Sequence, residues 1–333
     1  MEDISPAIPY EQRPEKFLLF PWRYPSIVWL PGKLLEWRWK KLLRITGREY
    51  IAEYFGTLVF ITFVLGGAAQ SFYSELKETG WIGGTWGAAI GIFFGMYTCL
   101  GVSGAHLNPA VTFALALVGK FSWLKVLFYW IAQFLGSFTA SFIVYLYYFD
   151  ALYRNNAGVA VTNSVNNSYK VWTTNPQDHV SNLNIFYDQL FSTLLLQFLI
   201  LSIMDRPNAG LVHHLKPVGV SLIVFAVGVC FSYNAGLAMN PIRDFPPRCF
   251  AAIIFGSDIF RIHNYYFWIP IIGPMIGAPI GAFIYIFFIE THHYPGYNPS
   301  QQNAESRISL ERQRLLDQHD DNGTTIDTEP KLN

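Results

Sequence analysis

The sequence predicts an all-α membrane protein with six transmembrane helices and two re-entrant half-helices in an inverted 3+3 repeat. Only 14% of its 333 residues are charged and 52% are hydrophobic, whereas an average soluble domain has about 25% charged residues. Six apolar segments are long enough to cross a bilayer. An Asn-Pro pair occurs twice, at Asn108-Pro109 and Asn240-Pro241, each at the start of a shorter apolar segment. These three observations carry the prediction.

A helix needs about 20 apolar residues to cross a hydrocarbon core of about 30 Å. Segments of this length lie near residues 51–72, 85–102, 123–149, 186–204, 217–235 and 265–289. Their interiors hold almost no charge, with Glu53 as the main exception. Two further apolar segments, 108–118 and 240–256, are too short to cross, and both begin with the Asn-Pro pair.

Lys and Arg near the ends of the segments predict the orientation. Nine of them precede the first segment, and Arg206 and Lys216 follow the fourth. The long loop 150–185 has only Arg154 and Lys170. We therefore expect a multi-pass protein of the plasma membrane with both termini in the cytoplasm. The tails are predicted to be residues 1–48, with an interfacial helix or a simple juxtamembrane anchor, and residues 291–333, which are polar and expected to be disordered.

The membrane domain, residues 49–290, contains an internal repeat. Glu53 near the start of the first segment matches Gln189 in the fourth, 136 residues later, and the two Asn-Pro pairs lie 132 residues apart. Each repeat has three spans, an odd number, so the second must insert upside down relative to the first. The predicted parts are repeat 1 at about 49–149, a loop at 150–185 and repeat 2 at about 186–290.

The Asn-Pro ends of the two half-spans should meet near the membrane midplane. Asn is a good N-cap and Pro is tolerated in the first helical turn. Non-helical backbone in a bilayer must line a wet path or be buried in protein. Acceptor carbonyls along such a path are expected from Gly104, Ala105, His106, Gly236, Ala238 and Met239. Two converging helix N-termini disfavour cations and protons there, whereas neutral polar molecules exchange hydrogen bonds.

Composition also argues against other classes. The net charge is zero, which argues against a nucleic-acid partner. The three cysteines, Cys99, Cys230 and Cys249, lie in or beside apolar segments, without the spacing of a disulfide framework or a metal site. No constellation for bond-making chemistry is visible. We expect no enzyme, no cofactor and no metal.

These motifs resemble the aquaporin (major intrinsic protein) family over roughly residues 48–290, and an aquaglyceroporin of eukaryotic, fungal type in particular. The stretch Ser103–Thr112 resembles the first half-helix of the family. The resemblance implies a right-handed six-helix bundle, a homotetramer in the lipid bilayer and a pore in each subunit for water and small neutral solutes. The central constriction it implies consists of Asn108, Pro109, Ala110, Asn240, Pro241 and Ile242. Ile242 departs from the family's small residue and is expected to shift the contact between the half-helices.

Counting from the two Asn residues, as in family members, also implies a selectivity filter. Its four positions are Ala88, Gly228, Leu237 and Arg243. Water-selective members resemble one another in carrying His at the position of Gly228, so this filter is expected to be wide and partly apolar. Trp86, two residues before Ala88, is the alternative for that position, because many glycerol channels have a residue of its size there.

Four further residues resemble markers of the glycerol subgroup: Asp244, Arg248, Pro270 and Ile271. Each is open to a structural interpretation as well. Asp244 and Arg248 are spaced to pair one helical turn apart, and Pro270 would kink the last span.

The leading hypothesis is thus a passive channel for water and glycerol-like solutes that excludes ions and protons. A water-selective channel and a secondary transporter built from inverted repeats are the alternatives. Transporters usually place ionisable residues in mid-membrane, and Glu53 has only Gln189 as its match. We expect both to be structural, with Glu53 holding the first loop. His213 and His214 are open to two interpretations, a gate that responds to protonation or an ordinary solvated loop. Asn166 is a glycosylation acceptor if its loop is extracellular.

Overall fold

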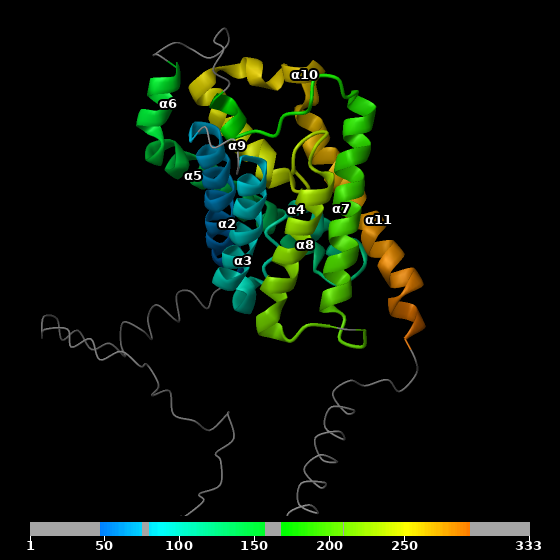
Figure 1. The fold of residues 1–333 in the computed structure, drawn as a ribbon. Coiled ribbons are helices and arrows are strands. Elements are labelled where there is room, and N and C mark those ends of the chain that lie inside the picture. Colours follow the sequence, from blue (N-terminus) through cyan, green and yellow to red (C-terminus); the bar gives the residue numbers. More distant parts are fainter. Residues whose placement is uncertain (1–46, 75–79, 157–167, 209, 294–333) are drawn as a thin grey trace, which may run out of the picture. The chain divides into compact units, whose positions relative to one another are not determined.

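The structure, a computed structural model, describes residues 47–74, 80–156, 168–208 and 210–293, and these form helices and connecting segments (Figure 1). The six long helices are α2 (Arg48–Tyr73), α3 (Gly80–Ser103), α5 (Trp123–Tyr147), α7 (Asn182–Met204), α8 (Lys216–Phe231) and α11 (Ile269–Phe288). The two re-entrant helices are α4 (Pro109–Leu117) and α9 (Pro241–Phe255). The short segments are α6 (Phe149–Asn156), η3 (Ser168–Val171), η4 (His213–Leu215), η5 (Ser257–Phe260), α10 (Ile262–Tyr265), η6 (Tyr266–Trp268) and η7 (Glu290–His292).

The six predicted spans and two half-helices are confirmed, with small differences at their ends. Within the described residues, six helical segments are long and apolar enough to cross a membrane. The fifth ends at Phe231 rather than at 235, because the chain turns there and the Gly236 N–H donates to the Ser232 carbonyl at 3.0 Å. Both predicted tails, except for the few residues next to α2 and α11, lie outside the described residues, as does Asn166.

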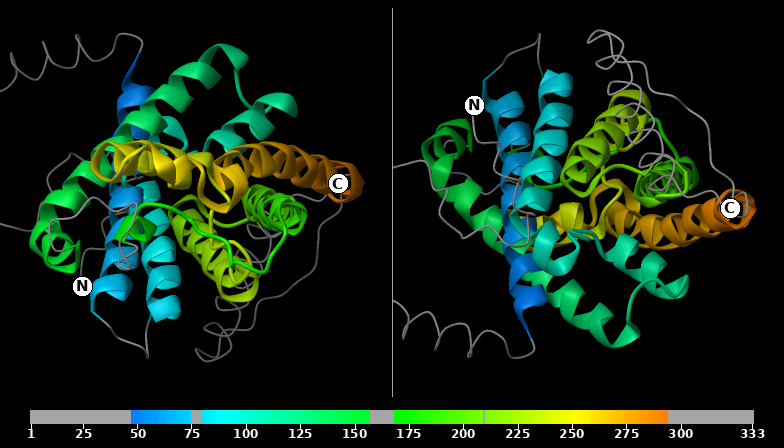
Figure 2. Two further views of the ribbon diagram at one scale, coloured as in Figure 1. Left: turned by 90° about the horizontal axis from the view of Figure 1, so that it is seen from above. Right: turned by 90° about the horizontal axis from the view of Figure 1, so that it is seen from below.

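The two repeats pack in a reciprocal way. In the first repeat α2 packs against α3 and α5, and in the second α7 packs against α8 and α11. The half-helix α4 contacts α5 and α11, and α9 contacts the same two helices. Figure 2 shows α2 beside α3 and α7 beside α8 from both ends of the bundle. Each half-helix is therefore held by the last span of its own repeat and by that of the other.

Small residues allow the long helices to approach closely. A Cβ atom placed on Gly67 of α2 would lie 3.1 Å from the Cα atom of Gly87 in α3. A Cβ atom on Gly277 or Gly281 of α11 would collide with the backbone of α7 at Leu190 or Leu194. Because lipid is as apolar as the side chains, helix association in a bilayer depends on such close packing.

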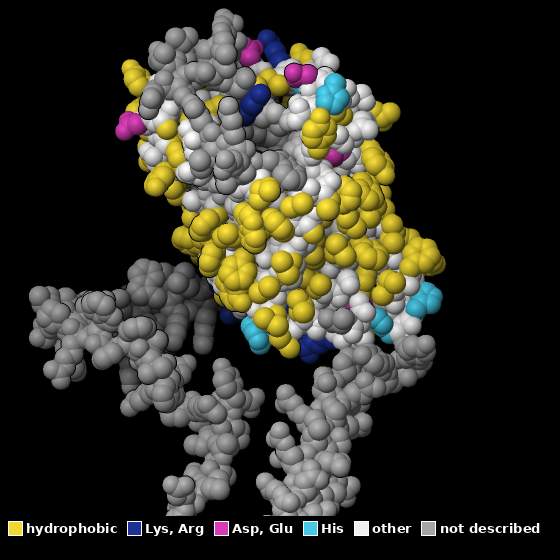
Figure 3. All heavy atoms as spheres, viewed as in Figure 1, with side chains coloured by type: hydrophobic (Ala, Val, Ile, Leu, Met, Phe, Trp, Pro, Cys, Tyr) yellow, Lys and Arg dark blue, Asp and Glu magenta, His cyan; other side chains and the backbone are white. Residues whose placement is uncertain are grey.

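The surface separates apolar and charged side chains. On the face shown in Figure 3, hydrophobic side chains cover the middle, while most charged and His side chains lie towards the two ends. Two ion pairs lie at one of these ends: Lys125 with Glu49 at 2.7 Å, and Lys120 with Glu290 at 2.5 Å. They join α2 to α5 and the end of α4 to the segment after α11. The described chain therefore enters and leaves the bundle at the same end.

Candidate functional site: a cavity at the two half-helix ends

The two Asn residues begin the half-helices in the same way. The Asn108 side chain accepts a hydrogen bond from the Ala110 N–H at 2.9 Å, and the Asn240 side chain accepts one from the Ile242 N–H at 3.1 Å. Each is thus an N-cap followed by proline in the first turn. The cap satisfies a backbone donor that no helical carbonyl reaches.

The same two side chains cross-link the repeats. Asn108 Nδ2 donates to the Met239 carbonyl at 2.9 Å, and Asn240 Nδ2 donates to the Leu107 carbonyl at 2.8 Å. Leu107 and Met239 both have φ of +50°, the left-handed region, which turns the chain just before each helix. An amide nitrogen has two hydrogens, and among the described groups each of these nitrogens has one acceptor. The second hydrogen of each amide remains for a solute.

A cavity of about 400 Å³ borders both of these Asn residues. Asn108, Asn240, Ala88 and Arg243 line it, and its wall continues to Lys120 and Glu290 at the end where the chain enters and leaves. Of the predicted acceptor residues, it is lined by Gly104, Ala105, His106, Ala238 and Met239. Gly236 does not line it. The Gly236 carbonyl instead accepts a hydrogen bond from Gln189 Nε2 at 3.2 Å.

The remaining predicted constriction residues lie behind the two amides. Pro109, Ala110, Pro241 and Ile242 are buried and do not line this cavity. The Ile242 carbonyl accepts a hydrogen bond from Ser137 Oγ of α5 at 2.5 Å, and the Ile242 side chain belongs to the main apolar core. The larger Ile242 side chain is therefore accommodated in this core.

Glu53 holds the first loop. Its Oε1 accepts from Ser103 Oγ at 2.7 Å and from the His106 N–H at 2.9 Å, and its Oε2 accepts from the Leu107 N–H at 2.9 Å. A fourth donor is Gln133 Nε2 at 2.9 Å. The backbone N–H groups of this loop have no helical carbonyl to bond to. The buried Glu53 carboxylate, which has four donors, supplies the acceptors that they need.

Gln189 holds the second loop with both halves of its amide. Its Nε2 donates to the Gly236 carbonyl and to Asp188 Oδ1, the latter at 2.8 Å. Its Oε1 accepts from the Met239 N–H at 3.3 Å. Asp188, a neighbour that the sequence comparison of the repeats did not single out, therefore supports the Gln189 amide, which makes the contacts to the loop.

Arg243 reaches the cavity from the first turn of α9. Its Nε donates to the Leu237 carbonyl at 3.0 Å, while its Nη1 is buried without a partner among the described groups. A buried guanidinium N–H without a partner is costly. Arg243 and Leu237 both line the cavity, so the guanidinium group lies at the cavity wall.

The other filter positions are arranged less simply. Ala88 lines the cavity and is almost fully buried. Gly228 does not line it: a Cβ atom on Gly228 would lie 2.6 Å from Thr85 Cγ2 and 3.0 Å from Leu237 Cδ2. Thr85, one helical turn before Ala88, thus fills the space opposite Gly228. Sequence reasoning missed Thr85, since counting along the chain does not show which residue of α3 faces α8.

Trp86, the alternative to Ala88, points elsewhere. Its ring packs against that of Phe225 in a tilted arrangement, with 4.5 Å between centroids, and it is 47% exposed. In a membrane it faces lipid or a neighbouring molecule, so the alternative is wrong.

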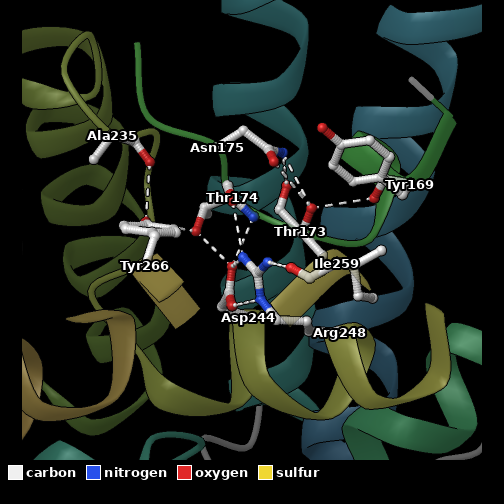
Figure 4. Close-up of polar contacts among 9 residues, drawn as sticks. All are labelled: Tyr169, Thr173, Thr174, Asn175, Ala235, Asp244, Arg248, Ile259 and Tyr266. Carbon is white, nitrogen blue, oxygen red and sulfur yellow. Dashed lines mark hydrogen bonds and ion pairs between the residues drawn. The ribbon is translucent and has the colours of Figure 1, made fainter. Parts of the chain in front are cut away.

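Asp244 and Arg248 form a buried ion pair in α9 (Figure 4). Arg248 Nε donates to Asp244 Oδ1 at 2.7 Å, one helical turn away. Both side chains are at most 1% exposed. Pro270 lies in the first turn of α11, where its missing N–H needs no partner, so its interpretation as a kink is wrong. Ile271 is the next residue of that turn and is partly buried.

The histidines lie in different surroundings. His106 lines the cavity, and its Nδ1 is 3.1 Å from Thr112 Oγ1. His213 and His214 lie in the exposed η4, where the His214 carbonyl accepts from the Tyr97 hydroxyl at 2.6 Å. In the described part of the chain, no group of three or more His, Cys, Asp or Glu side chains is placed to hold a metal ion.

Comparisons with known proteins agree with this geometry. Aquaporin-9 of Mus musculus is 35% identical over 269 residues, which cover 80% of this chain and 91% of that protein. Aquaglyceroporin-9 of Botryotinia fuckeliana is 34% identical over 264 residues, covering 78% of this chain and 58% of that protein. The X-ray structure of the aquaglyceroporin from Plasmodium falciparum superposes with a TM-score of 0.65 at 32% identity, covering 72% of this chain and 94% of that one.

A family model supports the same assignment. The model of the major intrinsic protein family matches residues 39–285, which include five of the long helices, both half-helices and all but the last three residues of α11. The duplicated Asn caps and their cross-links lie within this range. The chain belongs to the major intrinsic protein family.

Proposed function

We propose that this protein is a passive transmembrane channel for water and small neutral solutes such as glycerol. The observation that carries the proposal is the pair of Asn108 and Asn240 amides, which are fixed by the opposite repeat and both line one cavity. Neutral hydroxyl-bearing solutes exchange hydrogen bonds with these amides. A cation or proton meets two helix N-termini and the Arg243 guanidinium, which oppose positive charge.

The walls of the cavity support passage of a molecule with a carbon backbone. Ala88 of α3, Val224 of α8 and Leu237 of the loop before α9 line it. Small and aliphatic side chains leave width that a ring of polar or aromatic side chains would take up. We propose no enzymatic activity and no cofactor, because members of a channel family carry solutes and do not change them.

Stopped-flow light scattering on proteoliposomes tests the function. Sorbitol gradients report water efflux, and glycerol gradients report solute entry. The variant Ala88→Phe should reduce glycerol flux more than water flux, because its ring would project into the cavity. Trp86→Phe is the matched control on the outer face of the same helix and should leave both fluxes unchanged. Water flux without glycerol flux in the parent protein would make it a water-selective channel, and saturable ion-driven uptake would make it a transporter.

We also propose that four copies assemble in the plasma membrane with both termini in the cytoplasm. The family resemblance supports the tetramer, and the charge distribution supports the orientation. Among the described residues, the end where the chain enters and leaves carries more Lys and Arg than the opposite end. On the first end are Arg48, Lys120, Lys125, Arg206 and Lys216, and on the other Arg154, Lys170 and Arg261. Asn166 is then extracellular and is proposed to be glycosylated.

A further inference from the structure

A buried polar network lies next to the filter and is not used by the proposed function (Figure 4). Asp244 Oδ2 accepts hydrogen bonds from the Thr174 N–H at 2.7 Å, from Thr174 Oγ1 at 2.5 Å and from Arg248 Nη2 at 3.0 Å. Arg248 Nη2 also donates to the Thr174 carbonyl at 3.0 Å, and Nη1 donates to the Ile259 carbonyl at 3.0 Å. Three separate segments of the chain thus meet at one ion pair.

Thr174 connects this ion pair to the second loop. Its Oγ1 lies 3.0 Å from the Tyr266 hydroxyl, which donates to the Ala235 carbonyl at 3.4 Å. Its Cβ atom lies 3.6 Å from the place of a Cβ atom on Gly236, a residue with φ of +74°. The segment before α7 therefore packs directly on the backbone that leads to Leu237.

Both filter groups on this side are direct chain neighbours of the network. Arg243 precedes Asp244 in the first turns of α9, and Leu237 follows Gly236. The Arg243 guanidinium is itself tied to the Leu237 carbonyl. A shift of Asp244 or of the Gly236 backbone would therefore move the guanidinium and the Leu237 side chain relative to Ala88 across the cavity.

An ion pair is an expensive way to stabilise this region. Replacing a buried ion pair by apolar side chains often leaves the stability of a protein unchanged or raises it. What an ion pair adds is geometry, because its hydrogen bonds are directional. Here Asp244 has four bonds from two residues, and Arg248 spreads its fork over Asp244, Thr174 and Ile259. Such directional bonds suit a network that keeps groups at defined positions.

We propose that Thr174, Asp244 and Arg248 are positioning residues for the filter, and that through Arg243 and Leu237 they set the largest solute that passes. The inference rests on the proposed function as a channel for small neutral solutes. It assigns a part in selectivity to the loop before α7, although the described residues of that loop do not line the cavity.

The test compares glycerol with the longer polyol erythritol in proteoliposomes that contain the full chain. Thr174→Val keeps the shape of the side chain and removes its hydroxyl. The erythritol-to-glycerol permeability ratio should rise about five-fold, the factor that corresponds to one net hydrogen bond. Thr174→Ser restores the hydroxyl and should restore the ratio. Thr173→Val is the matched control: among the described residues the Thr173 hydroxyl, also buried, bonds to Tyr169 and Asn175 of its own loop.

The ratio does not depend on how much protein is reconstituted, so it separates positioning from folding. If Thr174→Val lowers the yield of folded protein but leaves the ratio at the parent value, the role is structural and the proposal is overturned. Arg248→Lys is the second variant. It keeps the positive charge but loses the planar guanidinium group with its several N–H donors, so it should also raise the ratio. A parent protein without glycerol flux would instead refute the proposed function.

Discussion

Glu53 and Gln189 occupy matching positions in the two repeats, but their hydrogen bonds differ in kind. Glu53 only accepts, from Ser103, Gln133 and two backbone N–H groups. Gln189 both donates, to a carbonyl and to Asp188, and accepts. The two loops therefore require different side chains, although both turn the chain before a half-helix.

Exchanging these side chains should destabilise the protein. Glu53→Gln places an NH₂ group against N–H or O–H donors in either amide orientation, and Gln189→Glu places a carboxylate against the Gly236 carbonyl and Asp188. Each buried mismatch costs about 1–3 kcal/mol. Thermal unfolding of detergent-purified protein measures the loss. Glu290→Gln, at a side chain that is 30% exposed, is a control that should cost less, and a Glu53→Gln variant as stable as the parent would contradict this account.

Gly228 has no side chain because Thr85 and Leu237 occupy the adjacent space. Gly228→Ala should therefore lower stability by about 1–3 kcal/mol through overpacking, although alanine ordinarily favours a helix over glycine. Thr85→Ser removes the methyl group nearest to the new Cβ atom and keeps the hydroxyl, so the double variant should regain most of the stability. Gly101→Ala, whose Cβ atom meets nothing within 4 Å, serves as the control and should not destabilise. Equal losses in the single and double variants would show that Thr85 is not the obstacle.

At the scale of elements, the contact between α7 and α11 depends on glycine. Gly277 faces the carbonyl of Leu190 so closely that a single Cβ atom would force the helices apart. Gly277→Ala should cost about 1–3 kcal/mol and lower both water and glycerol flux, because α11 also supports α4 and α9. Gly66→Ala in α2 has open space around it and should be neutral in the same thermal-unfolding and flux measurements. A neutral Gly277→Ala would mean that these helices slide without loss.

The start and end of each helix followed from local signals in the sequence. The rotation of each helix about its own axis, which decides the residues that face its neighbours, did not. Span length follows from hydropathy, and the starts of α4 and α9 follow from Asn-Pro, so the boundaries were predicted closely. The helices α3 and α8 are apolar on all sides, so periodicity does not indicate which residue faces which. For this reason Thr85 opposite Gly228 and Trp86 on the outside had to come from the structure. Thr174 was missed for a similar reason, since its loop has no motif and its partner lies 70 residues away.

At the scale of the whole molecule, orientation is open to a direct test. Single cysteines placed at Asn208 and Asp258, in variants that lack Cys99, Cys230 and Cys249, lie in the segment after α7 and in η5. An impermeant maleimide applied to intact cells should label Asp258→Cys and not Asn208→Cys, which should react only after the membrane is permeabilised. The reverse pattern would place the termini outside. Labelling of both in intact cells would point to mixed insertion.

The reciprocal bonds of Asn108 and Asn240 also bear on biogenesis. While the chain is being inserted, the first half-helix emerges more than a hundred residues before the Met239 carbonyl that its amide needs. Until then its unpaired polar backbone lies in lipid, where each orphan group costs several kcal/mol. A nascent chain arrested after α5 should therefore be a substrate for the chaperones and proteases of the membrane. Once the second repeat is inserted, these polar groups are paired and the chain should no longer be a substrate. Recognition of the unfinished chain would therefore depend on the same hydrogen bonds that lie beside the finished pore.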